Sequence, residues 1–206
     1  MSYYLKHHLS HQASLPSPLI NLIQPKDSIL DVGCGNGSLK QLFPRHQLSG
    51  VDILPDSLTL ARKAGYAKVL LVNLDQDKLP FKANSFDVII CRQVLEHLLF
   101  PVKATLEMYR VLRPKGILFV SVPTRANRKF DDDYTHIRPF TRHSLATLLY
   151  DAGFTRLHFV HQLRGIPGLG LIEQLLRLNL EPAKSSLAQQ LPWLRQSANI
   201  EVIARK

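Results

Sequence analysis

The sequence predicts an α/β fold built on a doubly wound, mostly parallel sheet. Residues 28–43 pass from a short apolar run into three closely spaced glycines and then into a helical pattern. This order of strand, glycine loop and helix is that of a nucleotide-binding unit. Beyond it, short apolar runs alternate with helical stretches, and a pair of late strands follows. Such alternation is typical of a sheet covered by helices.

The expected elements follow one another in short steps. Strands, recognised as short apolar runs, are expected at 29–32, 47–52, 67–72, 85–91, 117–122, 154–162 and 199–204. Helices are expected at 18–23, 38–43, 58–64, 101–112 and 141–150, with a further apolar helix start at 92–99. Gly65 is the expected end of the helix at 58–64, Thr141 is the expected N-cap of the helix at 141–150, and residues 113–116 are predicted to form a turn.

The length of 206 residues favours a single domain. We expect a flexible arm at 1–16 and one domain at 17–206 with a cap-like insert at 163–197.

Cys34 and Cys91 are the two cysteines. Their number and separation give neither a disulfide framework nor a zinc motif, so both are read as free thiols. The first residues lack the apolar core of a signal peptide and no apolar run could span a membrane, so a cytoplasmic protein is expected.

The net charge of +10, from 26 basic and 16 acidic residues, suits an acidic substrate or surface, or simply supports solubility. No basic block and no interleaving of basic with aromatic residues is present, so nucleic acid is not the expected partner.

The glycine loop has the spacing G-x-G-x-G, from Gly33 through Gly35 to Gly37, and Asp31 stands two residues before it. Dinucleotide sites use G-x-G-x-x-G with a helix N-terminus facing a pyrophosphate. An acid at the strand end would repel that anion. It suits a ligand with positive charge, such as S-adenosylmethionine, which carries an ammonium and a sulfonium group. We therefore favour S-adenosylmethionine over NAD.

Polar residues end the next two strands. Asp52 follows the loop by about 20 residues, where an acid accepts hydrogen bonds from ribose hydroxyls. It could instead cap the following helix, although residues 55–57 already provide a start for that helix. Asn73 or Asp75, after the third strand, could accept a hydrogen bond from the exocyclic amine of an adenine.

Together these features resemble the class I S-adenosylmethionine-dependent methyltransferases of the small type 11 branch, over about residues 17–160. The motifs that carry the resemblance are Asp31-x-Gly33-x-Gly35-x-Gly37, Asp52, Leu79-Pro80-Phe81, Ser85-Phe86-Asp87, Leu95-Glu96-His97 and Leu112-Arg113-Pro114-Lys115-Gly116. The resemblance implies a Rossmann-like, seven-stranded sheet with the last strand antiparallel and helices on both faces. It also implies S-adenosylmethionine as the cofactor.

The resemblance assigns the parts of the cofactor to residues of this chain. Asp31 and the loop at 33–37, including Cys34, would hold the methionine part, and Asp52 the ribose. Ile53, Asn73, Leu74 and Asp75 would contact the adenine, and Cys91 to Gln93 would line the methyl donor.

The acceptor side is expected in the long segment 124–140. His136 is the first candidate general base, followed by His97 and Tyr134. The alternative for His97, and the favoured one, is a hydrogen-bonded core histidine, and the alternative for His136 is a structural part of the loop. Arg138 could bind an anionic acceptor or pair with the acids at 131–133. No metal site is predicted, because three consecutive acids converge only in an unusual turn.

The residues after the fourth strand differ from the Asn-Pro-Pro-Tyr motif of enzymes that methylate amino groups of nucleic acids. A small-molecule, lipid or glycan acceptor is therefore favoured. The insert at 163–197 could cap that acceptor, meet a membrane surface, pack on the domain or form a dimer contact. A monomer or a homodimer is expected. The alternative function is a non-catalytic binding or assembly protein with the same fold.

Overall fold

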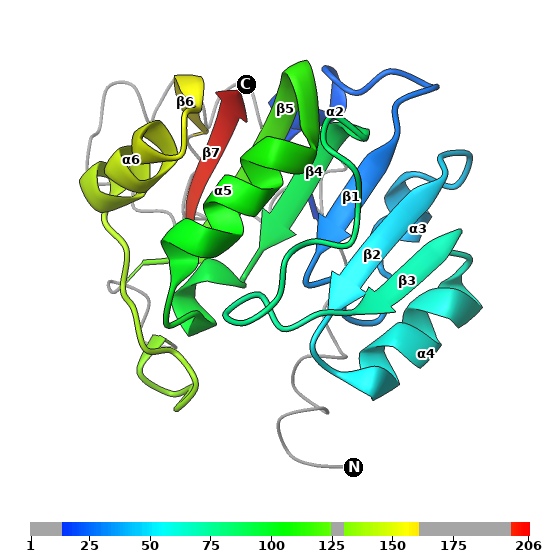
Figure 1. Ribbon diagram of the computed structural model, residues 1–206, viewed down its shortest axis with the longest axis horizontal. Coiled ribbons are helices and arrows are strands. Elements are labelled where there is room, and N and C mark those ends of the chain that lie inside the picture. The colour runs from blue at the N-terminus through cyan, green and yellow to red at the C-terminus, as the bar shows by residue number, and fades with distance from the viewer. Residues whose placement is uncertain (1–13, 125–129, 161–198) are drawn as a thin grey trace, which may run out of the picture.

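The computed structural model describes residues 14–124, 130–160 and 199–206 (Figure 1). The described residues form one seven-stranded sheet in the order β3-β2-β1-β4-β5-β7-β6. Its strands are β1 (Ile29–Val32), β2 (Leu48–Asp52), β3 (Lys68–Leu71), β4 (Phe86–Arg92), β5 (Leu112–Pro123), β6 (Thr155–Val160) and β7 (Asn199–Arg205).

All pairs from β3 to β5 are parallel, and β7 runs antiparallel to both of its neighbours, β5 and β6. The predicted doubly wound sheet with an antiparallel last strand is therefore confirmed. The chain winds from β1 outward to β3 and then restarts at β4 on the other side of β1. The strand order therefore reverses between β1 and β4, and open α/β sheets bind ligands at the carboxyl ends of the strands at such a point.

Helices cover both faces of the sheet. They are α2 (Ser17–Ile20), α3 (Leu39–Leu42), α4 (Pro55–Ala64), the 3₁₀ turn η1 (Leu95–His97), α5 (Pro101–Val111) and α6 (Arg142–Asp151). Buried side chains of α5 and α6 share one hydrophobic cluster, and those of α2, α3 and α4 share a second. Successive residues of β4 and β5 alternate between the two clusters, as the pleat of a strand requires. In Figure 1, α5 and α6 lie in front of the sheet.

Several predicted boundaries have a clear physical basis. Thr141 caps α6 through a reciprocal pair of bonds with Ser144, in which each side chain accepts from the backbone N–H of the other residue. Gly65 ends α4 in a left-handed conformation, with φ of 97°. The strand expected at 154–162 is described as β6 up to Val160, and its last two positions lie outside the described residues, as does the insert at 163–197.

Two local predictions were wrong. The helix start expected at 92–99 is absent: β4 extends to Arg92, Gln93 turns the chain with φ of 53°, and η1 covers only three residues. The turn expected at 113–116 is part of β5, which begins at Leu112 opposite Phe86 and bends at Lys115, with φ of 66°. Apolar periodicity does not detect left-handed residues that redirect the chain.

Within the described part of the chain, none of the helices combines the length and the apolarity needed to cross a membrane.

Candidate active site

The loop between β1 and α3 folds back onto the end of β2. The N–H groups of Gly33 and Cys34 both donate to the carbonyl oxygen of Val51, at 2.9 and 3.0 Å. Gly33, Gly35 and Gly37 have φ of 73°, 49° and 77°. This left-handed conformation is readily available only to glycine, so all three loop glycines are needed for the path of the backbone.

The surroundings of the three glycines differ. A Cβ atom on Gly33 would lie 2.3 Å from Cγ2 of Val94, and one on Gly37 would lie 2.8 Å from Cα of Ala61. A Cβ atom on Gly35 would meet nothing within 4 Å. Gly33 and Gly37 therefore allow close packing inside the protein, whereas Gly35 presents bare backbone to open space, where a ligand can approach it.

Asp52, at the end of β2, fixes the rim of this space. Its Oδ2 accepts the N–H of Gly35 at 2.8 Å, and its Oδ1 accepts the N–H of Leu54 at 2.9 Å. Each carboxylate oxygen has two lone pairs, so both can accept further hydrogen bonds. Ile53, which follows, is 56% exposed and offers an apolar surface beside the carboxylate.

Asp31 lies in β1 below the loop and is 3% exposed. Its Oδ2 accepts a 2.6 Å hydrogen bond from the Tyr66 hydroxyl. Burial raises the pKa of Asp31 to about 7, and the charge of Arg92 opposes that rise. A buried acid of this kind gains most from a cationic ligand, which would hold it in the ionised form.

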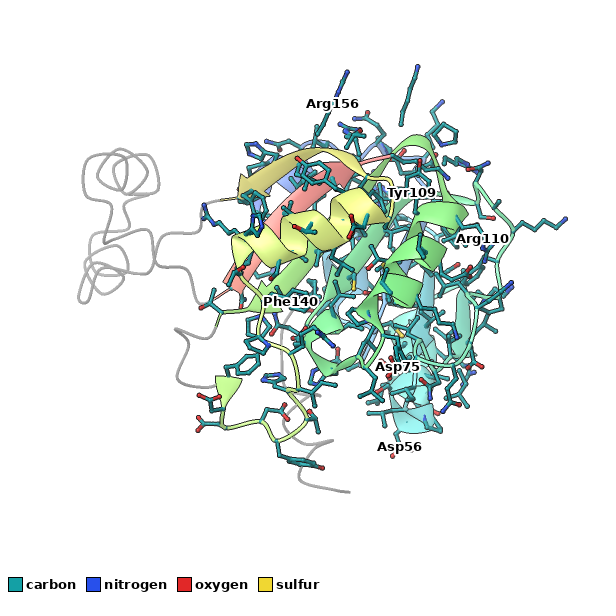
Figure 2. The ribbon with its side chains drawn as sticks, turned by 60° about the vertical axis from the view of Figure 1, so that its left-hand side comes forward. Asp56, Asp75, Tyr109, Arg110, Phe140 and Arg156 are labelled. Atoms are coloured by element: carbon teal, nitrogen blue, oxygen red, sulfur yellow. The ribbon has the colours of Figure 1, made fainter. Side chains whose placement is uncertain are left out.

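The residues predicted to meet the adenine form a turn after β3. Oδ1 of Asn73 accepts the N–H of Asp75 at 3.1 Å, and Leu74 is buried. The carboxylate of Asp75 turns toward α5, where it accepts the N–H groups of Phe100 at 2.8 Å and Leu99 at 3.3 Å (Figure 2). Asp75 thus holds the start of α5.

The two cysteines lie in the core. Cys91 is fully buried in β4, and Cys34 is 4% exposed. Burial raises the pKa of both thiols, so neither is a nucleophile at neutral pH. A Cβ atom on Gly50 would lie 2.8 Å from Sγ of Cys34, so a small residue is required there. Gln93 is exposed at the carboxyl end of β4, and its backbone N–H donates to the carbonyl oxygen of Ser121 at 2.8 Å.

The candidate acid–base residues fall into two groups. His97, in η1, and His136 lie side by side, with ring centroids 4.7 Å apart. Tyr134 is 85% exposed. Arg138 donates to the carbonyl oxygen of Leu99 at 3.4 Å.

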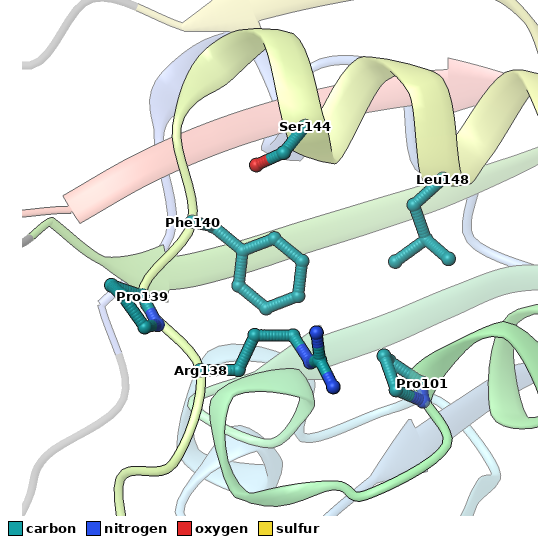
Figure 3. A pocket seen from close by; sticks show the side chains of 6 residues that line it. All are labelled: Pro101, Arg138, Pro139, Phe140, Ser144 and Leu148. Atoms are coloured by element: carbon teal, nitrogen blue, oxygen red, sulfur yellow. The ribbon is translucent and has the colours of Figure 1, made fainter.

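A pocket of about 200 Å³ lies between the start of α5, the 138–140 segment and α6 (Figure 3). It is lined by Pro101, Arg138, Pro139, Phe140, Ser144 and Leu148. Ligand pockets usually exceed about 300 Å³, so this space suits part of an acceptor better than a whole cofactor. Arg138 contributes its only cationic side chain.

Three residues of this region were not assigned a site role from the sequence. Tyr66 partners Asp31, Val94 closes the loop against Gly33, and Glu96 is buried beside the histidines. Glu96 carried a signal, because Glu96 and His97 stand together between the apolar residues 94–95 and 98–100, and a buried acid needs a partner. Tyr66 carried none, since its partner is distant in the sequence.

A family model described as a methyltransferase domain matches residues 30–120. The ubiquinone biosynthesis O-methyltransferase of Actinobacillus pleuropneumoniae is 30% identical over 112 residues, which are 50% of this chain and 48% of that protein. A probable S-adenosylmethionine-dependent methyltransferase of Mycobacterium tuberculosis is 33% identical over 133 residues, 61% of this chain and 48% of that protein. The chain spans about half the length of these relatives.

Solved structures share the fold. An S-adenosylmethionine-dependent methyltransferase from Mesorhizobium loti has a TM-score of 0.68 and 18% identity, and covers 92% of this chain and 96% of its own. A structure from Thermotoga maritima, described as a possible histamine N-methyltransferase, has a TM-score of 0.65 and 21% identity, and covers 91% of this chain and 86% of its own. At this identity the likeness concerns the fold alone.

Proposed function

Because this chain belongs to the class I S-adenosylmethionine-dependent methyltransferases of the type 11 branch, we propose that it transfers a methyl group from S-adenosylmethionine to an oxygen of a small organic acceptor. Family membership implies the cofactor. The O-methyltransferase named above supports oxygen as the acceptor atom, although its similarity spans only half of this chain.

The residues at the carboxyl ends of β1 and β2 fit the cofactor. The observation that carries the proposal is the open space at Gly35, bordered by the carboxylate of Asp52, with the buried acid Asp31 in the strand that leads into the same loop. Asp31 would hold the methionine ammonium, and Asp52 would accept from the ribose hydroxyls. Ile53 would provide an apolar surface for the adenine. After the next strand, Asn73 would offer its side-chain NH₂ group, since its backbone N–H donates to Asp77 and its Oδ1 accepts the N–H of Asp75.

S-adenosylmethionine supplies an electrophilic methyl group when it is bound. The protein then contributes position: it holds the acceptor oxygen in line with that methyl group, and such alignment is worth about 7–11 kcal/mol. A general base adds roughly 10²–10⁴-fold where the acceptor must lose a proton. His136, in the segment after β5, and His97, in η1, are the candidate bases, and Arg138 would bind an acidic acceptor in the pocket of Figure 3.

Two measurements test this function in sequence. Calorimetry with S-adenosylmethionine and with its demethylated product should show one site per chain, and no binding of either would refute the proposal. Transfer of radiolabelled methyl groups to fractions of cell extract then identifies the acceptor. Binding without transfer to any fraction would support the non-catalytic alternative.

A further inference from the structure

Glu96 is a buried acid without a compensating partner. Its side chain is fully shielded from solvent, and neither carboxylate oxygen has a hydrogen-bond partner among the described residues. A buried carboxylate is costly unless a cation or a hydrogen-bond donor accompanies it.

Two histidines approach this carboxylate from different segments. His97 follows Glu96 in η1, and His136 comes from the segment after β5. One oxygen of Glu96 and one nitrogen of each ring lie within 4.8 Å of one another. The carbonyl oxygen of Glu96 accepts the N–H groups of Ile137 and Arg138, at 3.0 and 3.1 Å, which ties the two segments together.

Hydrogen bonds fix the tautomer of each ring. Nδ1 of His136 lies 2.8 Å from the carbonyl oxygen of Phe130, which can only accept, so Nδ1 carries the proton. Nδ1 of His97 lies 3.0 Å from Oγ1 of Thr135, and that hydroxyl donates its own proton to Asp133 at 2.6 Å. Nε2 therefore keeps the lone pair in both neutral rings. Metal-binding histidines show this arrangement, with the second nitrogen donating to an oxygen of the protein.

We propose that Glu96, His97 and His136 bind one divalent transition-metal ion of the Zn²⁺ type. Two imidazoles and a carboxylate form a mixed nitrogen and oxygen set, which suits Zn²⁺, whereas Mg²⁺ and Ca²⁺ prefer oxygen alone. Asp133 is placed for a fourth ligand, because its Oδ2 lies 3.7 Å from Nε2 of His136. Ligands of a tetrahedral Zn²⁺ lie about 3.4 Å apart, so the side chains would draw together on binding.

The proposed metal site lies close to the glycine loop at 33–37, because Val94, two residues before Glu96, contacts Gly33. An ion held by the two Nε2 atoms would exclude both histidines as general bases. The proposal concerns the ion alone, so its test needs no methyl transfer and can fail or succeed independently of the proposed function.

The experiment uses the full chain without a histidine tag. His7, His8 and His11, in the first 13 residues, are a second possible zinc-binding group, so the parent protein carries Asn at these three positions. Calorimetry with Zn²⁺ should show one site of micromolar affinity or tighter. Co²⁺ should give the absorption bands of a tetrahedral ion, and Mg²⁺ at the same concentration should give no heat.

Single variants locate the site. Glu96→Gln keeps the shape of the side chain and removes its charge, and His136→Asn removes a ring nitrogen. Each should weaken Zn²⁺ binding by at least about 100-fold, since losing even an outer-shell partner costs 10–100-fold. Asp132→Asn, on an exposed neighbour, should bind as the parent does. If Glu96→Gln fails to fold by circular dichroism, His136→Asn decides alone. Absence of a 1:1 Zn²⁺ site, preference for Mg²⁺, or unchanged affinity in the folded variants would overturn the proposal.

Discussion

The hydroxyl of Tyr66 donates a 2.6 Å hydrogen bond to the carboxylate of Asp31, which is buried just before the glycine loop at 33–37. Tyr66 also packs directly behind that loop: Cβ atoms placed on Gly37 and Gly50 would lie 3.1 and 3.0 Å from its ring. This one side chain therefore supports the shape of the loop and sets the environment of the acid below it.

Replacing Tyr66 with Phe should keep the ring packing and leave Asp31 without its donor. An unsatisfied buried polar group costs about 1–3 kcal/mol, so the free energy of unfolding at about pH 8 should fall by that amount. Urea titration followed by circular dichroism measures the loss. Tyr150→Phe is the matched control, because Tyr150 is 55% exposed. Equal stability of the two variants would show that the Tyr66 hydroxyl contributes nothing.

The raised pKa of Asp31 should make cofactor binding depend on pH. The pKa of Asp31 is 3.8 in the unfolded chain and about 7 in the folded chain, so between these pH values the folded chain holds a proton that the unfolded chain has lost. The free energy of unfolding therefore falls as the pH rises through this range. A bound ammonium favours the ionised form. Affinity for S-adenosylmethionine should therefore increase up to about tenfold per pH unit below pH 7 and level off above it.

Calorimetry from about pH 5.5 to 8 tests this dependence. 5′-Methylthioadenosine lacks the amino acid part of the cofactor and should bind without the same rise. Asp31→Asn should bind S-adenosylmethionine more weakly and lose the dependence. A flat profile in the parent protein would place the ammonium away from Asp31.

Alanine at Gly35 and at Gly37 should have separable effects. Both positions have left-handed backbone, so each variant carries a cost of about 1–2 kcal/mol. At Gly37 the added Cβ atom also meets the backbone of Ala61 at 2.8 Å, and stability should fall further. At Gly35 it meets no protein atom, so the variant should fold and lose cofactor affinity. Thermal unfolding together with calorimetry distinguishes the two, and retained affinity in Gly35→Ala would contradict the assigned site.

The sequence predicts the strand, loop and helix cap of this site better than its side-chain contacts, because those elements depend on local sequence patterns. The β1 strand, the glycine loop and the Thr141 cap each arise from adjacent residues, and the structure has all three. The partners of Tyr66 and the convergence of Glu96 with His136 depend on strand order, which brings residues distant in the chain together. Asp75 shows a further limit: its residue type and its place after a strand suit adenine binding, but only the path of α5 shows what its carboxylate contacts.

Asp52 and Asp75 form a matched pair, since both were predicted from the sequence to bind the cofactor. Asp52 borders the space at Gly35, and Asp75 accepts the N–H groups at the start of α5. We expect Asp52→Asn to reduce cofactor affinity by about 100-fold, because hydrogen bonds to a charged group are worth about 1.5–3 kcal/mol each. Its amide oxygen can still accept one loop N–H, so the fold should persist.

Asp75→Ala should show the opposite pattern. Loss of a side-chain oxygen at a helix start costs about 0.5–2 kcal/mol, so the variant should unfold at lower urea concentration while its affinity for S-adenosylmethionine stays close to that of the parent. Measuring both quantities on both variants separates the two roles without any knowledge of the acceptor. If Asp75→Ala lost affinity with unchanged stability, its carboxylate would belong to the adenine site, and the contact with α5 would be secondary.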